Sequence, residues 1–447
     1  SKKVPNNQDP LLNAIRQSYQ RHLPKQIKPE VIDIALSGGS DSMALLHGLI
    51  ELQVEFNFKL HAIHIHHGIS PNADQWLEFC KAECKKNNVP ISTAQINIQS
   101  ESKLGIEGAA RKLRYEALEK FRQGMLVTAH HQNDQAETLF LQLIRGSGLK
   151  GLASMAPYDS ERNFWKPLLS VGRETIDGYV KDNHVAFIKD ESNLDTRYDR
   201  NFLRQEIFPV LTQRFPHLIK TLTRSVEHIA EGLHLTEAIA QEDAKNYFSE
   251  DFCRLSLSMI KALPKDRIIN LVRWWLDQNQ TKMPAKSTMD ELYDQIISLK
   301  KDSALLIKVS DKTIIRAYQD ELWLVKGDLD TESFELIWRG EEKITLPDQS
   351  QLIFNQKKGQ GFSMKKLGVK VLRIQSRLGG EKFKPNEKQP TRTLKYLLQS
   401  SNIPPWERDS IPLIFSEDRL VAVPNFGVHF EFQAGQDETG FMVEWVR

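Results

Sequence analysis

The sequence predicts an α/β domain with a parallel sheet and helices on both faces, followed by a mainly helical middle domain and a small α+β C-terminal domain. The chain has 447 residues, which is too long for one compact core. Strand-like and helix-like segments alternate over its first half, whereas long helical patterns and then short strands follow. We therefore place the three domains at residues 1–215, 216–333 and 334–447.

The first domain is predicted to consist of repeated β-α units. Short apolar runs indicate buried strands, and longer segments with apolar residues at helical spacing indicate amphipathic helices. Such repeats form a parallel sheet whose ligands lie at the carboxyl ends of the strands. The predicted strands are 31–36, 59–69, 89–98 and 124–131, and the predicted helices are 41–53, 73–88, 105–122 and 133–146.

The pattern changes from about Thr212. Long helices dominate the middle domain and short strands close it, while the last domain mixes strands with one helix that Pro404 and Pro405 end. The predicted helices are 221–249, 265–279, 287–299 and 391–402, and the predicted strands are 304–310, 312–318, 321–327, 370–376 and 420–430.

The composition is that of an ordinary globular protein, with 40% hydrophobic and 26% charged residues. No apolar run approaches the length of a membrane span, and the first residues lack the apolar core of a secretory signal. Three cysteines do not suggest a disulfide framework, and Cys80 and Cys84 are best explained as small buried helix residues. We expect a cytoplasmic protein without a membrane partner, and the sequence leaves open whether it is a monomer or a homodimer.

A glycine- and hydroxyl-rich turn, "SGGSDS", joins the first predicted strand to its helix. Gly38 and Gly39 let the backbone approach a ligand, and the helix N-terminus directs amide N–H groups and a positive dipole end at the same place. These features predict a phosphate site, although a plain β-α turn capped by Ser40 or Asp41 is the alternative. Because the turn lacks the lysine of a Walker A loop, a metal ion on Asp41 is needed to offset triphosphate charge.

A second polar segment, "AHHQNDQAET", follows the last strand predicted in this domain. It places His130 and His131 just past the strand end, and Asp134 and Glu137 on one face of the next helix. Carboxylates at the start of a helix also serve its dipole, so the residues alone leave their role open. The later "GSGLKG" has the spacing of a dinucleotide fingerprint, but it follows a helix and is predicted to be a helix cap and loop.

"SGGSDS" resembles the pyrophosphate loop of the N-type ATP pyrophosphatases. Further segments narrow the resemblance, and the chain is similar to the tRNA(Ile)-lysidine synthetases in their long form. The resemblance runs from about Val31 to Val428 and is dense between Val31 and Pro209. It rests on "GIEGAARKLRY", "TAHHQNDQAETLFLQLIRGSGLKGL", "KPLL", "DESNLDTRYDRNFLRQEIFP" and "RLGGEKFKPNEKQPTRTLKYLLQSSNIPPWERDSIPLIF".

The resemblance implies an adenine nucleotide alpha hydrolase-like fold and a ligase that uses ATP and Mg²⁺. The wobble cytidine of a tRNA(Ile) with anticodon CAU is adenylated on its 2-carbonyl oxygen with loss of pyrophosphate, and the ε-amine of L-lysine then displaces AMP. With the residue types, the resemblance assigns catalysis to Asp41, Arg111, His130 and His131; ATP binding to Ser37, Gly38, Gly39, Ser40, Asp41, Ser42 and His67; lysine binding to Asp134, Glu137 and Arg204; and magnesium to Asp41.

Two of these assignments have open alternatives. Arg111 and Arg114 share one helix face, where they can neutralise departing pyrophosphate or form an ordinary basic surface. Either His130 or His131 can accept a proton from the attacking amine near pH 7, and the sequence does not distinguish them.

A basic cluster in the last domain predicts contacts with the RNA backbone. Ten basic residues and only two acidic residues lie between Lys365 and Lys395. A solvated basic face is the alternative. Phe383, Tyr396 and Trp406 are either stacking groups or core residues, and for Trp406 we favour the core. The predicted tRNA contacts are Lys382, Lys384, Arg392 and Lys395.

Two other functions compete with the ligase. A tRNA sulfur transferase of the same loop class generally relies on active-site cysteines, often Cys-x-x-Cys, and this chain has no such pair. A non-catalytic tRNA-binding protein is the second alternative. The complete loop, Asp41 and the pair of Asp134 and Glu137 argue against it.

Overall fold

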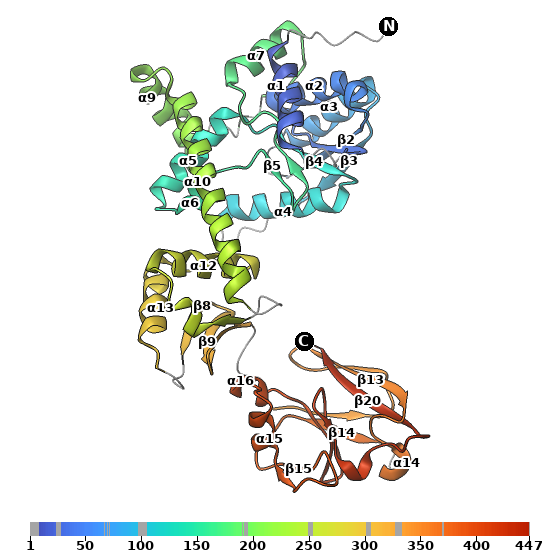
Figure 1. Ribbon diagram of the computed structural model, residues 1–447. Coiled ribbons are helices and arrows are strands. Elements are labelled where there is room, and N and C mark those ends of the chain that lie inside the picture. Colours follow the sequence, from blue (N-terminus) through green and yellow to red (C-terminus); the bar gives the residue numbers. More distant parts are fainter. Residues whose placement is uncertain are drawn as a thin grey trace. The chain divides into compact units, whose positions relative to one another are not determined.

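The computed structural model describes residues 9–23, 28–66, 68, 70, 72–96, 105–189, 191, 195–248, 254–300, 305–326, 333–368 and 371–446, with only the backbone described for 105–111. Contacts divide the chain into two compact units, Ser1–Ile239 and Ala240–Arg447 (Figure 1). None of the described helices is long and apolar enough to cross a membrane.

The first unit is built on a six-stranded sheet in the order β3-β2-β1-β4-β6-β5. All neighbours are parallel except β5 and β6. The predicted parallel sheet is therefore confirmed, while the two-residue strands β5 and β6 are too short to show a period in the sequence. The strands are β1 (Val31–Ala35), β2 (Lys59–His66), β3 (Ile91–Gln95), β4 (Met125–Val127), β5 (Tyr158–Asp159) and β6 (Phe164–Trp165).

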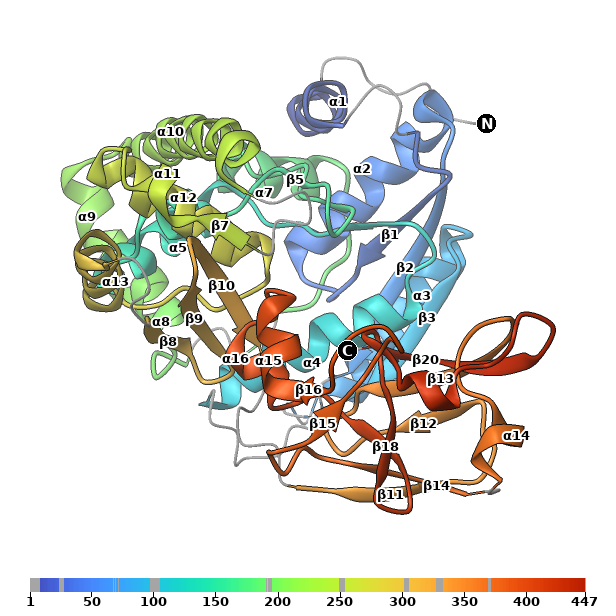
Figure 2. The same cartoon turned by 60° about the horizontal axis from the view of Figure 1, so that its bottom comes forward.

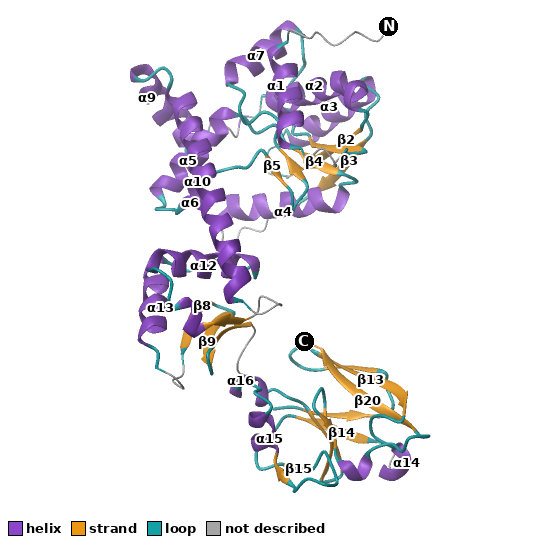
Figure 3. Cartoon of the chain, viewed as in Figure 1, coloured by secondary structure: helices purple, strands orange, loops and turns teal. Residues whose placement is uncertain are grey.

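Helices cover both faces of this sheet. Successive strand residues point to opposite faces, and apolar residues on each face pack against helices. Ile34 and Val127 pack in the main core with α1 and α2, whereas Ile63 and Leu126 pack with Leu118 of α4 on the other face. Figure 3 shows α2 and α4 on opposite sides of the strands. The helices are α1 (Pro10–His22), α2 (Ser40–Phe56), α3 (Ala73–Lys86), α4 (Gly105–Phe121), α5 (Gln132–Ile144), α6 (Leu149–Leu152), α7 (Arg173–Asp182), α8 (Asp199–Phe202), the π-helix η2 (Leu203–Ile207), α9 (Phe208–Arg214) and α10 (Leu218–Tyr247), which continues into the second unit.

The first part of the second unit packs helices on a four-stranded antiparallel sheet, β7-β10-β9-β8. Its core forms around the fully buried Trp275. The predicted long helices and the strands that close this region are present. The elements are β7 (Arg254–Ser256), α11 (Leu257–Ile260), α12 (Lys265–Gln278), α13 (Lys286–Ser298), β8 (Leu306–Ser310), β9 (Thr313–Tyr318) and β10 (Glu321–Lys326).

The last part of the chain contains a five-stranded sheet, a three-stranded sheet and the ribbon of β15 and β16, which leads directly into α15 (Figure 2). Because α15 ends at Ser400 and Pro405 begins α16, the prolines start a new helix and do not directly end the predicted one. The elements are β11 (Glu335–Trp338), β12 (Lys343–Thr345), β13 (Gln351–Lys358), α14 (Met364–Leu367), β14 (Leu372–Gln375), β15 (Lys382–Phe383), β16 (Arg392–Thr393), α15 (Leu394–Ser400), α16 (Pro405–Arg408), β17 (Leu413–Ser416), β18 (Arg419–Val423), β19 (Gly427–Val428), the 3₁₀-helix η3 (Phe430–Phe432) and β20 (Thr439–Val446).

Candidate active site

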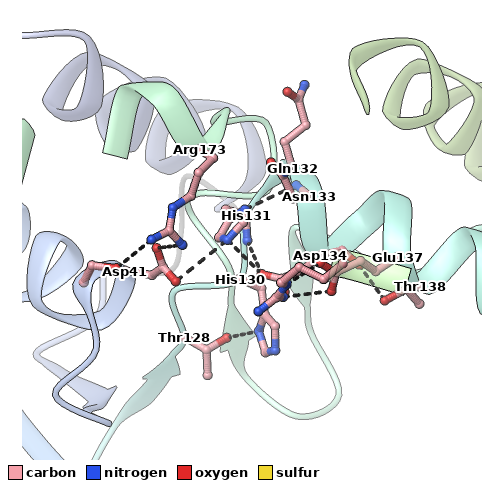
Figure 4. A network of polar contacts seen from close by, with 12 residues as sticks. Asp41, Thr128, His130, His131, Gln132, Asn133, Asp134, Glu137, Thr138 and Arg173 are labelled. Atoms are coloured by element: carbon pink, nitrogen blue, oxygen red, sulfur yellow. Dashed lines mark hydrogen bonds and ion pairs between the residues drawn. The ribbon is translucent and has the colours of Figure 1, made fainter. Parts of the chain in front are cut away.

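Three loops of the first unit meet at the carboxyl ends of neighbouring parallel strands. β1 pairs with β4 and β4 pairs with β6, and these strands lead into α2, α5 and α7. Parallel neighbours end at the same edge of a sheet, so the N-termini of the three helices converge there. Figure 4 shows Asp41, His131 and Arg173 from these three loops in one polar network.

The loop before α2 is held in a tight form that leaves its helix end uncapped. Gly38 has φ +88°, which favours glycine, and a Cβ there would lie 2.8 Å from Ile188 Cδ1 and displace that side chain. The Ser42 hydroxyl donates to the Gly39 carbonyl at 3.0 Å and lies 3.1 Å from Ser37 Oγ. Gly39 is the N-cap, and no side chain described here caps the helix. Neither Ser40 nor Asp41 therefore serves as the cap, and the first-turn amides are not occupied by a capping side chain.

Asp41 lies at the start of α2 and is paired with groups from both other loops. Arg173 Nη1 donates to Asp41 Oδ1 at 2.8 Å, and Arg173 Nη2 donates to Ser40 Oγ at 2.9 Å (Figure 4). On the other side, His131 Nε2 lies 3.8 Å from Asp41 Oδ2. The Asp41 side chain is 31% exposed, so it remains accessible to a ligand.

His131 links the phosphate loop to the carboxylates of α5. It is the N-cap of α5, and its Nδ1 accepts the backbone N–H of Asn133 at 3.2 Å. In the neutral ring the proton must then be on Nε2. Nε2 points toward Asp41 and also lies 3.6 Å from Asp134 Oδ2, which itself accepts the His131 backbone N–H at 2.9 Å.

His130 lies beside this link in a different environment. Its Nδ1 is 2.7 Å from Thr128 Oγ1. Burial is the main cause that lowers the pKa of His130, and the nearby cations of Arg200 and Arg114 lower it further, against the opposing effect of Asp134. The His130 imidazole is therefore neutral at pH 7, and its lowered pKa makes it a weak proton acceptor.

Asp134 and Glu137 form a buried acidic pair that faces two guanidinium groups. Glu137 is 1% exposed and accepts two hydrogen bonds from Arg204, at 2.8 Å from Nε and 2.9 Å from Nη2. Arg204 Nη2 also donates to Asp134 Oδ1 at 3.3 Å, and Arg200 Nε lies 3.2 Å from Glu137 Oε2. The π-helix η2 and α8 supply Arg204 and Arg200 four residues apart, so both side chains reach the same carboxylate.

The two carboxylates have opposite pKa shifts. Burial raises the pKa of Glu137, although its hydrogen bonds from Arg204 act against this. Burial also acts to raise the pKa of Asp134, but His131, His130 and Arg200 outweigh it and lower that pKa. Asp134 therefore keeps its charge to lower pH than Glu137 does.

Two of the predicted site residues cannot be placed in the structure. His67 is outside the described residues, and of Arg111 only the backbone, within α4, is described. Arg114 is exposed on α4. Lys166 of "KPLL" is buried, where its Nζ donates to the Ala156 carbonyl at 3.2 Å.

The remaining histidines and cysteines of the first unit do not form a metal site in the described part of the chain. His64 Nδ1 donates to the Leu36 carbonyl at 2.9 Å, and His66 Nε2 lies 3.0 Å from Asp74 Oδ1. Cys80 and Cys84 are fully buried, and burial raises their thiol pKa values to about 12 and about 11. Their predicted role as small buried helix residues is confirmed.

In the second unit, the four basic residues predicted to contact tRNA gather around the ribbon of β15 and β16. Lys384 Nζ lies 4.4 Å from the centre of the Phe430 ring, and the Arg392 guanidinium lies 4.5 Å from the ring of Tyr396. Phe383 is fully buried and Tyr396 is 50% exposed, so only Tyr396 of this pair presents a stacking surface. Trp406 is half-buried, with its ring 6.1 Å from that of Trp323 and 6.2 Å from that of Tyr318. The four residues are Lys382, Lys384, Arg392 and Lys395.

Most of the chain matches known protein families. Residues 11–211 match the model of the PP-loop domain, residues 255–323 that of the TilS substrate binding domain, and residues 372–445 that of the TilS substrate C-terminal domain. The tRNA(Ile)-lysidine synthase of Nitrosomonas europaea is 35% identical, covering 96% of this chain and 95% of that protein. The chain belongs to the tRNA(Ile)-lysidine synthase family.

Other members of the family match over similar lengths. The tRNA(Ile)-lysidine synthase of Haemophilus influenzae is 37% identical over 88% of this chain and 94% of that protein, and that of Coxiella burnetii is 32% identical over 92% of each. The family resemblance stated from the sequence is confirmed. A solved U34-tRNA thiolase, NcsA from Methanococcus maripaludis, covers 49% of this chain and 79% of its own at 18% identity and a TM-score of 0.41, which is too weak to support any argument.

The sequence analysis did not assign two residues of the network, Arg173 and Arg200. Arg173 is a single arginine at the start of a helix, 132 residues from its partner Asp41. Arg200 lies four residues before Arg204, and only that helical spacing indicates that both face the same carboxylate. Both contacts depend on which helices the sheet brings together.

Proposed function

We propose that this protein is a cytoplasmic ligase that uses ATP to join L-lysine to the wobble cytidine of a tRNA(Ile) with anticodon CAU. The observation that carries the proposal is a continuous polar network, from Asp41 through His131 to Asp134, Arg204 and Glu137 (Figure 4). It joins a phosphate loop to a buried pair of carboxylates. A site of this kind can hold an activated group and an amine next to each other.

The phosphate loop fits the polyphosphate end of ATP. Gly38 gives the backbone its tight turn, and the α2 N-terminus, with no capping side chain among the described residues, offers amide donors and a positive dipole end. Mg²⁺ binds through one or two carboxylates, substrate phosphates and water, and Asp41 is a carboxylate in the right place to hold it. When bound, Mg²⁺ offsets the negative charge of the phosphates.

The buried pair fits the amino acid. A free amino acid carries an ammonium and a carboxylate on the same carbon, so it needs opposite charges side by side. Asp134 and Glu137 supply the negative groups, and Arg204 supplies a planar guanidinium that matches a carboxylate. In the free protein the carboxylates and the guanidinium pair with each other. We expect bound lysine to separate them, with its ammonium beside the carboxylates and its carboxylate beside Arg204.

The reaction then proceeds in two displacements. The cytidine 2-carbonyl oxygen attacks the α-phosphorus of ATP, and pyrophosphate leaves toward the α2 N-terminus, whose amides stabilise its charge. The lysine ε-amine attacks the activated ring carbon, and the bond to AMP breaks. The attacking amine must lose a proton. The lowered pKa of His130 makes its imidazole a weak proton acceptor, and His131 already uses its Nδ1 lone pair on Asn133, so we assign this proton to solvent.

Incubation with ATP, labelled lysine and total tRNA tests this function. We expect label in the RNA, together with release of AMP and pyrophosphate. A tRNA sulfur transferase would release AMP without incorporating lysine, and only when given a sulfur donor. A non-catalytic tRNA-binding protein would bind RNA and release no AMP.

A further inference from the structure

Arg173 has three hydrogen-bond partners that together fix its guanidinium against the phosphate loop. Nη1 donates to Asp41 Oδ1 at 2.8 Å, Nη2 donates to Ser40 Oγ at 2.9 Å, and Nε donates to Asp177 Oδ1 at 3.0 Å. Asp177 lies one turn along α7, so it orients the side chain from behind. The planar fork therefore faces the loop in a single orientation (Figure 4).

This arrangement is poorly explained by stability alone. Arg173 is the first residue of α7, where a positive charge is unfavourable against the helix dipole. Its side chain is 40% exposed, and ion pairs exposed to this extent contribute little to folding. A guanidinium fork held beside an uncapped helix N-terminus does, however, match the shape and charge of a phosphate group.

We infer that Arg173 is a phosphate-binding residue that changes partner when the nucleotide arrives. Without nucleotide, Arg173 pairs with Asp41. With ATP bound, Arg173 pairs with the pyrophosphate end of the nucleotide, and Asp41 is left to bind the metal ion. The inference rests on the proposed function, in which this loop binds ATP. It adds an order of events, since Arg173 occupies Oδ1 of Asp41 until a nucleotide takes Arg173, and only then are both carboxylate oxygens open to a metal.

The exchange predicts two effects of opposite sign from one substitution. Arg173→Gln removes a cation from the phosphates, so nucleotide binding weakens on the order of ten- to a hundredfold. The same substitution releases Asp41, so a divalent cation binds the nucleotide-free protein more tightly than it binds the wild type. A residue with a merely structural role would not strengthen metal binding.

The experiment uses the full chain without tRNA. Calorimetry measures binding of an ATP analogue with a methylene bridge between the α and β phosphates, in the presence of Mg²⁺. Electron paramagnetic resonance of free Mn²⁺, which prefers the same oxygen ligands as Mg²⁺, measures metal binding without nucleotide. The matched control is Arg162→Gln, which removes another exposed arginine that pairs with an aspartate, Asp159, outside the network.

We expect Arg173→Gln to bind the analogue more weakly and Mn²⁺ more tightly, and Arg162→Gln to match the wild type in both. If Arg173→Gln changes neither affinity while Asp41→Asn weakens nucleotide binding, the partner exchange is wrong and the ATP site stands. If Asp41→Asn and Arg173→Gln both leave analogue binding unchanged, the loop is not the ATP site and the proposed function fails. Should Arg173→Gln not fold, Arg173→Lys decides, because it keeps the charge without the fork, and an unchanged analogue affinity contradicts the inference.

Discussion

The ion pair between Glu137 and Arg204 gives a quantitative prediction for lysine binding. Glu137→Gln keeps the size of the side chain but removes its charge, in a position that is 1% exposed and accepts two hydrogen bonds from Arg204. Hydrogen bonds to charged groups contribute about 1.5–3 kcal/mol and neutral ones about 1 kcal/mol, so we assign a loss of about 0.5–2 kcal/mol in attraction for the lysine ammonium. That loss corresponds to a rise of about 2- to 30-fold in the KM for lysine.

The assay is steady-state transfer of labelled lysine to tRNA(Ile), with lysine and ATP varied in turn. We expect the KM for lysine to rise and the KM for ATP to stay near its wild-type value, because the phosphate loop is untouched. Glu116→Gln is the matched control, since Glu116 forms an exposed ion pair with Lys112 on α4. A Glu137→Gln protein that is folded, as judged by its thermal midpoint, and has an unchanged KM for lysine refutes the assignment of this pair.

Three further predictions concern the phosphate loop, the basic ribbon and the buried histidine. Asp41→Ala should abolish lysine transfer and leave tRNA binding in a filter assay mostly intact; near-normal turnover with Mg²⁺ and ATP would mean that the loop has another role. Reversing the charges of Lys382 and Lys384 should weaken tRNA binding and reduce its salt slope by roughly 2, whereas an unchanged slope would mean that these residues form only a solvated face. Because the pKa of His130 is lowered in the fold, unfolding favours its protonated form, so the free energy of unfolding should fall as pH drops below 6.5. In urea titrations His130→Gln should lose part of that dependence, and an identical pH profile would contradict the burial argument.

The sequence predicts the sheet and the location of the site for the same physical reason. Strands that alternate with helices must form parallel neighbours, and parallel neighbours bring their carboxyl ends to one edge. The segments that contain Asp41 and His131 each follow a strand, so both can be expected at the same edge of the sheet. The 3.8 Å between their side chains depends in addition on β1 and β4 being neighbours. The role of Gly38 can also be predicted from the sequence, since its tight turn needs a residue that adopts a positive φ.

Contacts between distant helices could not be predicted in this way. Arg173 follows the two-residue strand β6, which shows no period, and its pairing with Asp41 depends on the strand order. Phe383 and Tyr396 are both aromatic residues beside lysines, yet one is fully buried and the other half exposed. Phe383 of β15 packs in a core with Leu394 and Leu398 of α15, whereas Tyr396 lies on the exposed side of that helix. Residue type alone did not separate stacking surface from core.

Adenylation of the tRNA before lysine addition can be measured directly. The protein is incubated with tRNA(Ile) and ATP labelled at the α-phosphate while lysine is withheld, and the label on the tRNA is counted before and after lysine is added. We expect label to accumulate on the tRNA with release of pyrophosphate and to leave as AMP once lysine is added. Label that never reaches the tRNA, or formation of ADP and inorganic phosphate instead, would contradict it.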